Sequence, residues 1–365
     1  MIFVPYYKLR KGMKIANDIS LSNKQISKAF LLKQGAILTQ DNIEKLSNFN
    51  ISGVYIDDGR KNPILDETLR RESVLAVKEI FSLCENTHAI LNESTLKQIE
   101  NISERLVDSI YKDEEISVSI SDLQTYDLNT YLHSVSVTVI SIAIGTALSL
   151  DKKELCKLGV CALLHDIGKI EIPIEIINKP SKLTKEEFEI VKTHAQLGAK
   201  YVMDHRCVSD DIYGGIISHH EKYNGTGYPN ALKSDDIPLF GRIISVADVY
   251  DALTGNRPYR NPIKPLEAIE YIMAGVGSSF DYNIVKAFLR KIEPYPVGSY
   301  VRLSDKRCAK VLKVNKDNPL RPVIRLADGS NKIVDLQNDP NTRNIVILDI
   351  DYSYLVSDSI KKKCV

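Results

Sequence analysis

Histidine is the residue type in this chain whose placement points to chemistry. The sequence has seven histidines, five of which lie in one region, and imidazole is a common metal ligand. Aspartates that could balance the charge of bound cations lie in the same region. Five imidazoles and two carboxylates would be costly to bury in one helical core unless metal ions used their lone pairs. The candidate ligands are His133, His165, Asp166, His194, His219, His220 and Asp248.

His194 shows the structural alternative for these residues. A single histidine on an apolar helix face is more often a hydrogen-bonded core residue than a ligand. His194 and its neighbours recur at spacings of three and four residues, which places the imidazole on the hydrophobic, inward face of a helix. An inward imidazole needs a polar partner. The residues that define this face are Phe188, Val191, Gly198 and Tyr201.

The adjacent pair His219 and His220 raises a geometric problem. On a continuous helix two neighbouring side chains diverge by about 100°. Joint ligation is therefore easiest if the helix ends near this pair, where the turn Asn224–Pro229 follows.

Lys169 comes at the end of a predicted helix that is rich in Leu155, Leu158, Cys161 and Leu164, with Gly168 as its expected C-terminal stop. The side chain of Lys169 then projects toward whatever lies beyond that helix end. As an alternative, it is a solvated cation that the helix dipole favours.

A second set of charged residues lies further along the chain. Asp248 and Asp251 are one helical turn apart and share a face, so that one could bind metal while the other orients it. Arg257 and Arg260 follow that helix and could clamp a phosphate in bidentate fashion. The alternative for the two arginines is a set of surface salt bridges around a turn.

The elements that position these residues are mainly helical. A capping box of Thr184 and Glu187 opens one helix, and Pro238 lies near the start of another. Short β-branched runs flank the helical region on both sides. We expect a small β-rich module over 1–62, a helical connector over 63–116, a helical domain over 117–292 and a C-terminal β-barrel-like module over 293–365.

Composition narrows the class of protein. The 365 residues are 44% hydrophobic with a formal net charge of +1, which fits a globular protein and gives no reason to expect a nucleic acid polymer as partner. The six cysteines show no paired spacing, and the N-terminus shows no export signal, so we expect reduced thiols in a cytoplasmic protein. The apolar stretch 134–150 is too short and too rich in Ser and Thr for a membrane span, and we expect a buried core helix.

Taken together, the motifs in residues 117–292 resemble those of the HD-GYP domain, a branch of the HD metal-dependent phosphohydrolases. The resemblance covers about half of the chain and rests on an ordered set of motifs. These are Tyr131-Leu132-His133-Ser134, His165-Asp166-Ile167-Gly168-Lys169, His194, His219-His220-Glu221, Asn224-Gly225-Thr226-Gly227-Tyr228-Pro229, Asp248-Val249-Tyr250-Asp251-Ala252 and Arg257-Pro258-Tyr259-Arg260.

The resemblance implies an all-helical HD-type bundle with a metal centre that hydrolyses the bacterial second messenger cyclic di-GMP to pGpG, and often on to GMP. It implies that one metal ion draws on His133, His165 and Asp248, and the other on His194, His219 and His220. Asp166 bridges the two ions. Substrate contacts are expected from Lys169, Gly227, Tyr228, Asp251, Arg257 and Arg260.

Two departures from the family pattern bear on this expectation. Members with a third metal carry a Glu where this chain has Asn129, so we expect two divalent ions, iron or manganese. Asn224 replaces the commoner Asp before the GYP loop, which suits a turn equally well. The expected nucleophile is a hydroxide that bridges the metal ions, with Asp166 positioning the pair and Lys169 stabilising charge on the phosphoryl oxygens.

Other functions compatible with the motifs are a weak or inactive HD-GYP signalling protein that binds cyclic di-GMP or protein partners, and a phosphodiesterase for another cyclic dinucleotide such as cyclic GMP-AMP. A different HD-type di-iron chemistry is a further alternative, which the arginine pair and the GYP loop disfavour. Protein partners at the GYP loop and a homodimer are also compatible with the family. The flanking modules carry no recognisable ligand motif.

Overall fold

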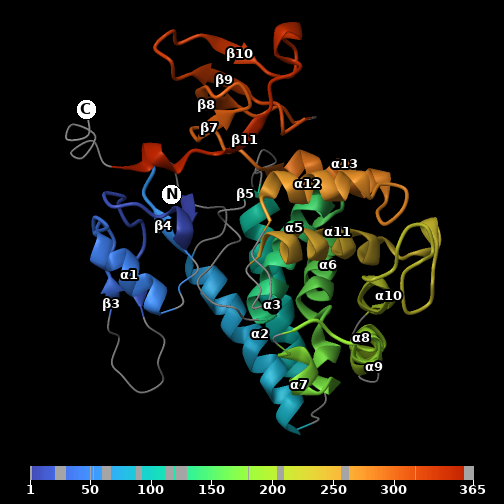
Figure 1. The fold of residues 1–365 in the computed structure, drawn as a ribbon. Coiled ribbons are helices and arrows are strands. Elements are labelled where there is room, and N and C mark those ends of the chain that lie inside the picture. The colour runs from blue at the N-terminus through green and yellow to red at the C-terminus, as the bar shows by residue number, and fades with distance from the viewer. Residues whose placement is uncertain are drawn as a thin grey trace. The chain divides into compact units, whose positions relative to one another are not determined.

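The structure is a computed structural model whose contacts divide the chain into two compact units. The first unit comprises Met1–Pro63, Ser119–Asp127 and Glu293–Val365, and the second comprises Ile64–Val118 and Leu128–Ile292. Figure 1 colours the ribbon by residue number, so that the segments of each unit can be followed along the chain. The residues that the structure describes are 2–20, 30–49, 51, 53–59, 67–87, 93–111, 118–119, 130–179, 181–203, 209–255, 263–316 and 318–356.

The second unit is helical, as the sequence predicts. Its elements, in chain order, are α2 (Glu67–Thr87), α3 (Glu93–Tyr111), α5 (Thr130–Ala147), α6 (Lys152–Leu164), η2 (Ile167–Glu171), α7 (Ile174–Ile177), α8 (Lys185–Lys192), α9 (His194–Met203), α10 (Asp210–Ser218), η3 (Ser234–Asp236), α11 (Leu239–Thr254), α12 (Pro265–Ala274) and α13 (Tyr282–Lys291). Short strands β5 (Val118–Ser119) and β6 (Ile292–Glu293) pair with each other.

Helix α5 is the buried core helix that its apolar sequence predicts. It packs against α2, α3, α6, α11 and α13, and residues 133–145 along it are buried. Two of its hydroxyl groups bond within the helix: the Thr138 Oγ1 donates to the Ser134 carbonyl at 2.7 Å and the Thr146 Oγ1 to the Ile142 carbonyl at 2.9 Å. Among the described residues, no helix has the length and apolar character that crossing a membrane would require.

The predicted helix starts are confirmed. Thr184 and Glu187 form a capping box at the start of α8, and Pro238 is the N-cap residue of α11. A second capping box, formed by Asp151 and Glu154, opens α6.

Two details of the sequence interpretation are wrong. The segment after Thr184 is not one helix, because α8 ends at Lys192 and α9 begins at His194, with Thr193 between them. Phe188 is therefore 48% exposed and does not extend the buried face of His194. Gly168 does not stop α6, which ends at Leu164; it lies in η2, where a Cβ would come within 2.0 Å of the His194 carbonyl oxygen.

The other unit contains the two chain ends. Its N-terminal part has β1 (Ile2–Pro5), η1 (Tyr6–Lys8), β2 (Ile19–Ser20), β3 (Phe30–Leu32), α1 (Gln40–Asn48) and β4 (Gly53–Ile56), with β1 antiparallel to β4. Helix α1 was not expected from the sequence; it is a nine-residue helix that a Thr39–Asn42 capping box opens.

The expected C-terminal β module is a five-stranded antiparallel sheet of order β10-β9-β8-β7-β11. Its apolar side chains alternate inward along the strands and form a core of their own. The Lys8 Nζ lies 3.2 Å from the Asp349 Oδ2, so the first and last parts of the chain meet in this unit. The strands are β7 (Tyr300–Leu303), β8 (Cys308–Lys313), β9 (Val323–Leu326), β10 (Ile333–Asp335) and β11 (Ile347–Ile350), with η4 (Pro340–Thr342) and η5 (Tyr352–Leu355) beside them.

Helix α10, which leads to the His219 pair, approaches its neighbours through glycine. A Cβ on Gly215 would lie 2.4 Å from the Cys161 Sγ in α6 and 2.8 Å from the Phe240 Cβ in α11. A Cβ on the adjacent Gly214 would meet Pro238 at 3.2 Å, a far smaller overlap. Close packing at Gly215 therefore sets the position of α10 between α6 and α11.

We predict that Gly215→Ala destabilises the helical unit while Gly214→Ala does not. Both changes gain about 1 kcal/mol of helix propensity, but overpacking at Gly215 costs about 1–3 kcal/mol. The free energy of unfolding, measured by urea titration with circular dichroism, should therefore be lower for Gly215→Ala than for Gly214→Ala by about 1–3 kcal/mol. Equal stabilities for the two variants would contradict this packing.

Candidate metal centre

The candidate ligands come from separate elements and meet inside the helical unit. The side chains of His165, His194 and His219 are at most 1% exposed, and Asp166 is equally buried. They are contributed by α5 (His133), the turn after α6 (His165, Asp166), the first residue of α9 (His194), the end of α10 (His219, His220) and the middle of α11 (Asp248).

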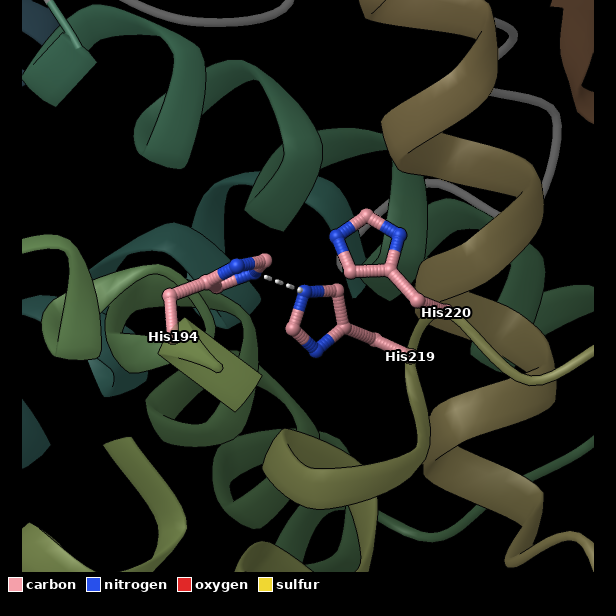
Figure 2. A group of neighbouring side chains, drawn as sticks. All are labelled: His194, His219 and His220. Carbon is pink, nitrogen blue, oxygen red and sulfur yellow. Dashed lines mark hydrogen bonds between the residues drawn. The ribbon is translucent and has the colours of Figure 1, made fainter. Parts of the chain in front are cut away.

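Among the described residues, these side chains form two groups able to hold a metal ion. One consists of His133, His165 and Asp166, and the other of His194, His219 and His220; in each, the ligand atoms lie within 4.8 Å of one another. Figure 2 shows the imidazoles of the second group pointing toward one another from α9 and from the end of α10. Because α10 ends at Ser218, both members of the His219 pair can face one centre.

Three of the imidazoles are oriented in the same way. In each, the Nδ1 donates to the backbone carbonyl three residues earlier, in the final turn of a helix. Since a carbonyl only accepts hydrogen bonds, the proton lies on Nδ1 and the Nε2 carries a lone pair. The pairs are His165 with Ala162 at 2.8 Å, His194 with Val191 at 2.6 Å and His219 with Ile216 at 2.6 Å.

The Nε2 atoms that result are arranged for a cation. Those of His194 and His219 lie 3.2 Å apart, so two lone pairs face each other when both rings are neutral. The buried Nε2 of His165 has no hydrogen-bond partner in the described part of the chain. Divalent metal ions, one at each group, would satisfy these nitrogens, which fits the chemistry of this donor set.

Asp166, a member of the first group, also faces the second. Its Oδ2 is 3.5 Å from the His165 Nε2 and 3.9 Å from the His133 Nε2, whereas its Oδ1 is 3.5 Å from the His194 Nε2. The Lys169 Nζ donates to the Oδ2 at 2.5 Å. Each carboxylate oxygen therefore faces a different imidazole group, as a bridging ligand requires.

His133 is held by two carboxylates of α11. Its Nε2 lies 3.0 Å from the Asp248 Oδ1, and its Nδ1 lies 2.6 Å from the Asp251 Oδ2. The other oxygen of Asp248 is 3.9 Å from the His220 Nδ1. Of the two roles that the sequence left open for the aspartates, Asp251 thus occupies the orienting position behind a histidine.

The electrostatics keep most imidazoles neutral. Burial lowers the pKa of His165, His194 and His219, and lowers that of His220 to about 3. His133 differs, because burial is outweighed by its hydrogen bonds to Asp248 and Asp251, which raise its pKa to about 9. Burial would raise the pKa of Asp166, but the Lys169 ammonium, together with the protonated His133, holds it well below its usual range.

The expected substrate-binding residues lie around this centre where the structure describes them. The Tyr228 ring stacks on the His220 ring with centroids 4.8 Å apart and an interplanar angle of 29°. Gly227 must be glycine, because a Cβ would lie 2.4 Å from the Glu221 Cα. Arg257 and Arg260 fall outside the described residues.

Two nearby residues were not given a role by the sequence analysis. The Lys192 Nζ lies 5.7 Å from the centroid of the Tyr228 ring. Glu221 is a 2% exposed carboxylate directly after the His219 pair. Only the tertiary structure reveals the position of Lys192, whereas the place of Glu221 beside two histidines was a signal that the sequence analysis could have followed. The Asn224 Oδ1 accepts from the Thr226 N–H at 3.1 Å, which confirms the expected turn.

The chain is similar to several known phosphodiesterases of cyclic dinucleotides. Its residues 116–284 match the HD domain family. A cyclic di-GMP phosphodiesterase of Pseudomonas aeruginosa, PA4108, is 31% identical over 356 residues, which cover 88% of this chain and 84% of that protein. A cyclic di-GMP phosphodiesterase of Thermotoga maritima is 34% identical over 68% of each chain.

A solved structure supports the fold. The HDG"Y"P protein Bd1817 of Bdellovibrio bacteriovorus superposes with a TM-score of 0.53 at 19% sequence identity, over 79% of this chain and 97% of that one. At this identity the likeness concerns the fold.

We predict that Asp251→Asn weakens metal binding. The amide cannot replace the charged acceptor of the His133 Nδ1 proton, and losses of such partners weaken metal affinity by roughly 10- to 100-fold. The measurement is the metal content per chain, by mass spectrometry, after equilibration with increasing chelator. Asp211→Asn is the matched control, because Asp211 pairs with Lys157 at the surface. Equal metal retention in both variants would contradict the orienting role.

Proposed function

The chain belongs to the HD domain family, in its HD-GYP branch, and from this premise we propose that the centre described above hydrolyses cyclic di-GMP to pGpG, with GMP as the product of a second cleavage. The protein is thus a phosphodiesterase. The observation that carries the proposal is the position of Asp166, whose two oxygens face two different groups of buried imidazoles. An inactive signalling protein would have no need to keep both groups complete.

The residues fit two divalent metal ions. We propose that one ion draws on His133, His165 and Asp248 and the other on His194, His219 and His220, with Asp166 between them. When bound, such ions lower the pKa of a water molecule and neutralise charge on a phosphodiester. We propose iron or manganese, since mixed imidazole and carboxylate donors suit these metals.

Lys169 supplies charge at the edge of the centre. Its side chain is 27% exposed, while that of Asp166, to which it donates, is 2% exposed. An ammonium group has three protons, so one can stay on Asp166 while the others reach a phosphoryl oxygen. Lys169 therefore both holds Asp166 in place and offers a donor where negative charge develops.

Asp251 and Tyr228 act on two of the proposed ligands. Asp251 keeps the Nδ1 proton of His133 in place, so that the Nε2 faces inward. The Tyr228 ring covers His220 and offers an aromatic surface beside the centre, and burial raises the pKa of its hydroxyl, which stays protonated at neutral pH. Arg257 and Arg260 remain proposed phosphate ligands.

We also propose a reducing, cytoplasmic setting. Cys84, Cys156, Cys161 and Cys308 are free thiols, which is compatible with it. A homodimer and protein partners at the Tyr228 loop stay predictions, and light scattering after size-exclusion chromatography tests the first of them.

The central test is incubation with cyclic di-GMP in the presence of Mn²⁺ or Fe²⁺, followed by chromatography for pGpG and GMP. We expect turnover by the wild type and none by Asp166→Ala, with unchanged circular dichroism. Parallel reactions with cyclic GMP-AMP decide between the two dinucleotides. Turnover by metal-replete Asp166→Ala would contradict the site, and binding without turnover by the wild type would favour a signalling protein.

We predict that Lys169→Met lowers kcat by about 100-fold or more, the usual effect of removing one group that stabilises the charge of the transition state. Metal content measured on the same sample separates this effect from loss of the ions. Lys179→Met is a matched control, because the Lys179 side chain is also 27% exposed and forms a comparable ion pair with Glu187. Similar kcat values for the two variants would rule out the role of Lys169.

A further inference from the structure

Glu221 is a buried carboxylate that the proposed mechanism does not use. Its Oε1 accepts from the Asn230 N–H at 2.7 Å, and its Oε2 accepts from the Leu232 N–H at 3.1 Å. Both oxygens are thus engaged by the backbone of one segment, nine and eleven residues further along. Hydrogen bonds of an ionised acceptor to backbone N–H groups are roughly twice as strong as neutral ones.

The segment 221–232, which joins Glu221 to these backbone partners, folds back onto the end of α10. The Tyr228 N–H donates to the His220 carbonyl at 3.3 Å. Gly227 lies directly against the backbone of Glu221 and Lys222, where a Cβ would come within 2.3 Å of the Lys222 nitrogen. The part of the segment at Gly227 and Tyr228 is therefore held against the backbone around Glu221.

The start of the same segment, at Tyr223 and Asn224, is held by the turn before α13. The Tyr223 N–H donates to the Ser279 carbonyl at 3.1 Å, and the Asn224 N–H donates to the Ser278 carbonyl at 2.9 Å. These bonds fix the start of the segment to the turn before α13. The Ser234 N–H closes the base of the loop by donating to the Tyr223 carbonyl at 2.9 Å. Between these points, the Glu221 carboxylate binds the backbone that directly follows Tyr228 and Pro229.

Tyr228 lies between the two points that matter. It follows Gly227 directly, and it precedes by two residues the Asn230 N–H that Glu221 binds. Its ring stacks on His220, a proposed metal ligand, and also lies beneath the Lys192 ammonium. A shift of the segment would move an aromatic ring that borders the centre.

We propose that Glu221 is a positioning residue that acts through Tyr228: its carboxylate clamps the backbone at Asn230 and Leu232, and so holds the Tyr228 ring over His220 for contact with the substrate. The inference rests on the proposed function for its kinetic part only. The clamp itself is a property of the segment 221–232, and it can be measured without substrate.

Glu221→Gln is the decisive variant, because the side chain keeps its size and loses one acceptor. The amide NH₂ then faces a backbone N–H, donor against donor. We expect faster hydrogen exchange at the Asn230 and Leu232 amides, and a KM for cyclic di-GMP raised by roughly 10- to 100-fold with a smaller change in kcat. Metal content should stay at the wild-type level.

A double-mutant cycle with Tyr228→Ala tests the route of the effect. If Glu221 acts through Tyr228, Glu221→Gln causes no further rise in KM once the ring is absent. Additive effects would overturn the proposal, as would loss of metal from Glu221→Gln, which would mean that Glu221 acts on His220 instead. Asp235→Asn is the control. Asp235 lies just after the segment, and its carboxylate binds Arg242 at the surface, so this change should leave the exchange of both amides and the KM unchanged.

The exchange measurement separates this proposal from the proposed function. Unchanged protection of both amides in Glu221→Gln would refute the clamp, whether or not the enzyme turns over. Absence of turnover in the wild type would refute the phosphodiesterase assignment, and faster exchange in the variant would still establish the clamp.

Discussion

The Asp166 carboxylate is buried among imidazoles, with one oxygen toward His133 and His165 and the other toward His194. Taking a carboxylate out of water costs several kcal/mol even after relaxation, and here Lys169 offsets part of that cost. The remaining lone pairs and charge are what two cations would neutralise. The surrounding helices can be understood as the structure that keeps this carboxylate and its partners in register.

Helix ends provide that register. The carbonyls in the last turn of a helix have no partner within it, and the last turns of α6, α8 and α10 each give one to the Nδ1 proton of a histidine. The negative ends of three helix dipoles accordingly converge where cations are expected. One arrangement thus satisfies the backbone, sets the tautomer of the imidazoles and favours metal binding.

Close backbone contacts make this convergence possible. Gly168 admits the His194 carbonyl, Gly215 admits α6 and α11, and Gly227 admits the backbone of Glu221. In each case a β-carbon would push a ligand-bearing segment away from the centre. The Glu221 carboxylate extends the same principle to the loop of Tyr228, because it fixes a segment without regular secondary structure by binding its backbone directly.

The sequence alone determined the helical class, the C-terminal β module, the capping box at Thr184 and the ordered set of histidines and aspartates, because these depend on local patterns and residue types. It could not determine that the helix after Thr184 breaks at Thr193, that Gly168 serves a backbone contact, or that Asp251 supports His133. Those features depend on which segments approach each other across the core. The positions of Lys192 and Glu221 around Tyr228 likewise follow from long-range packing, which no periodicity in the chain records.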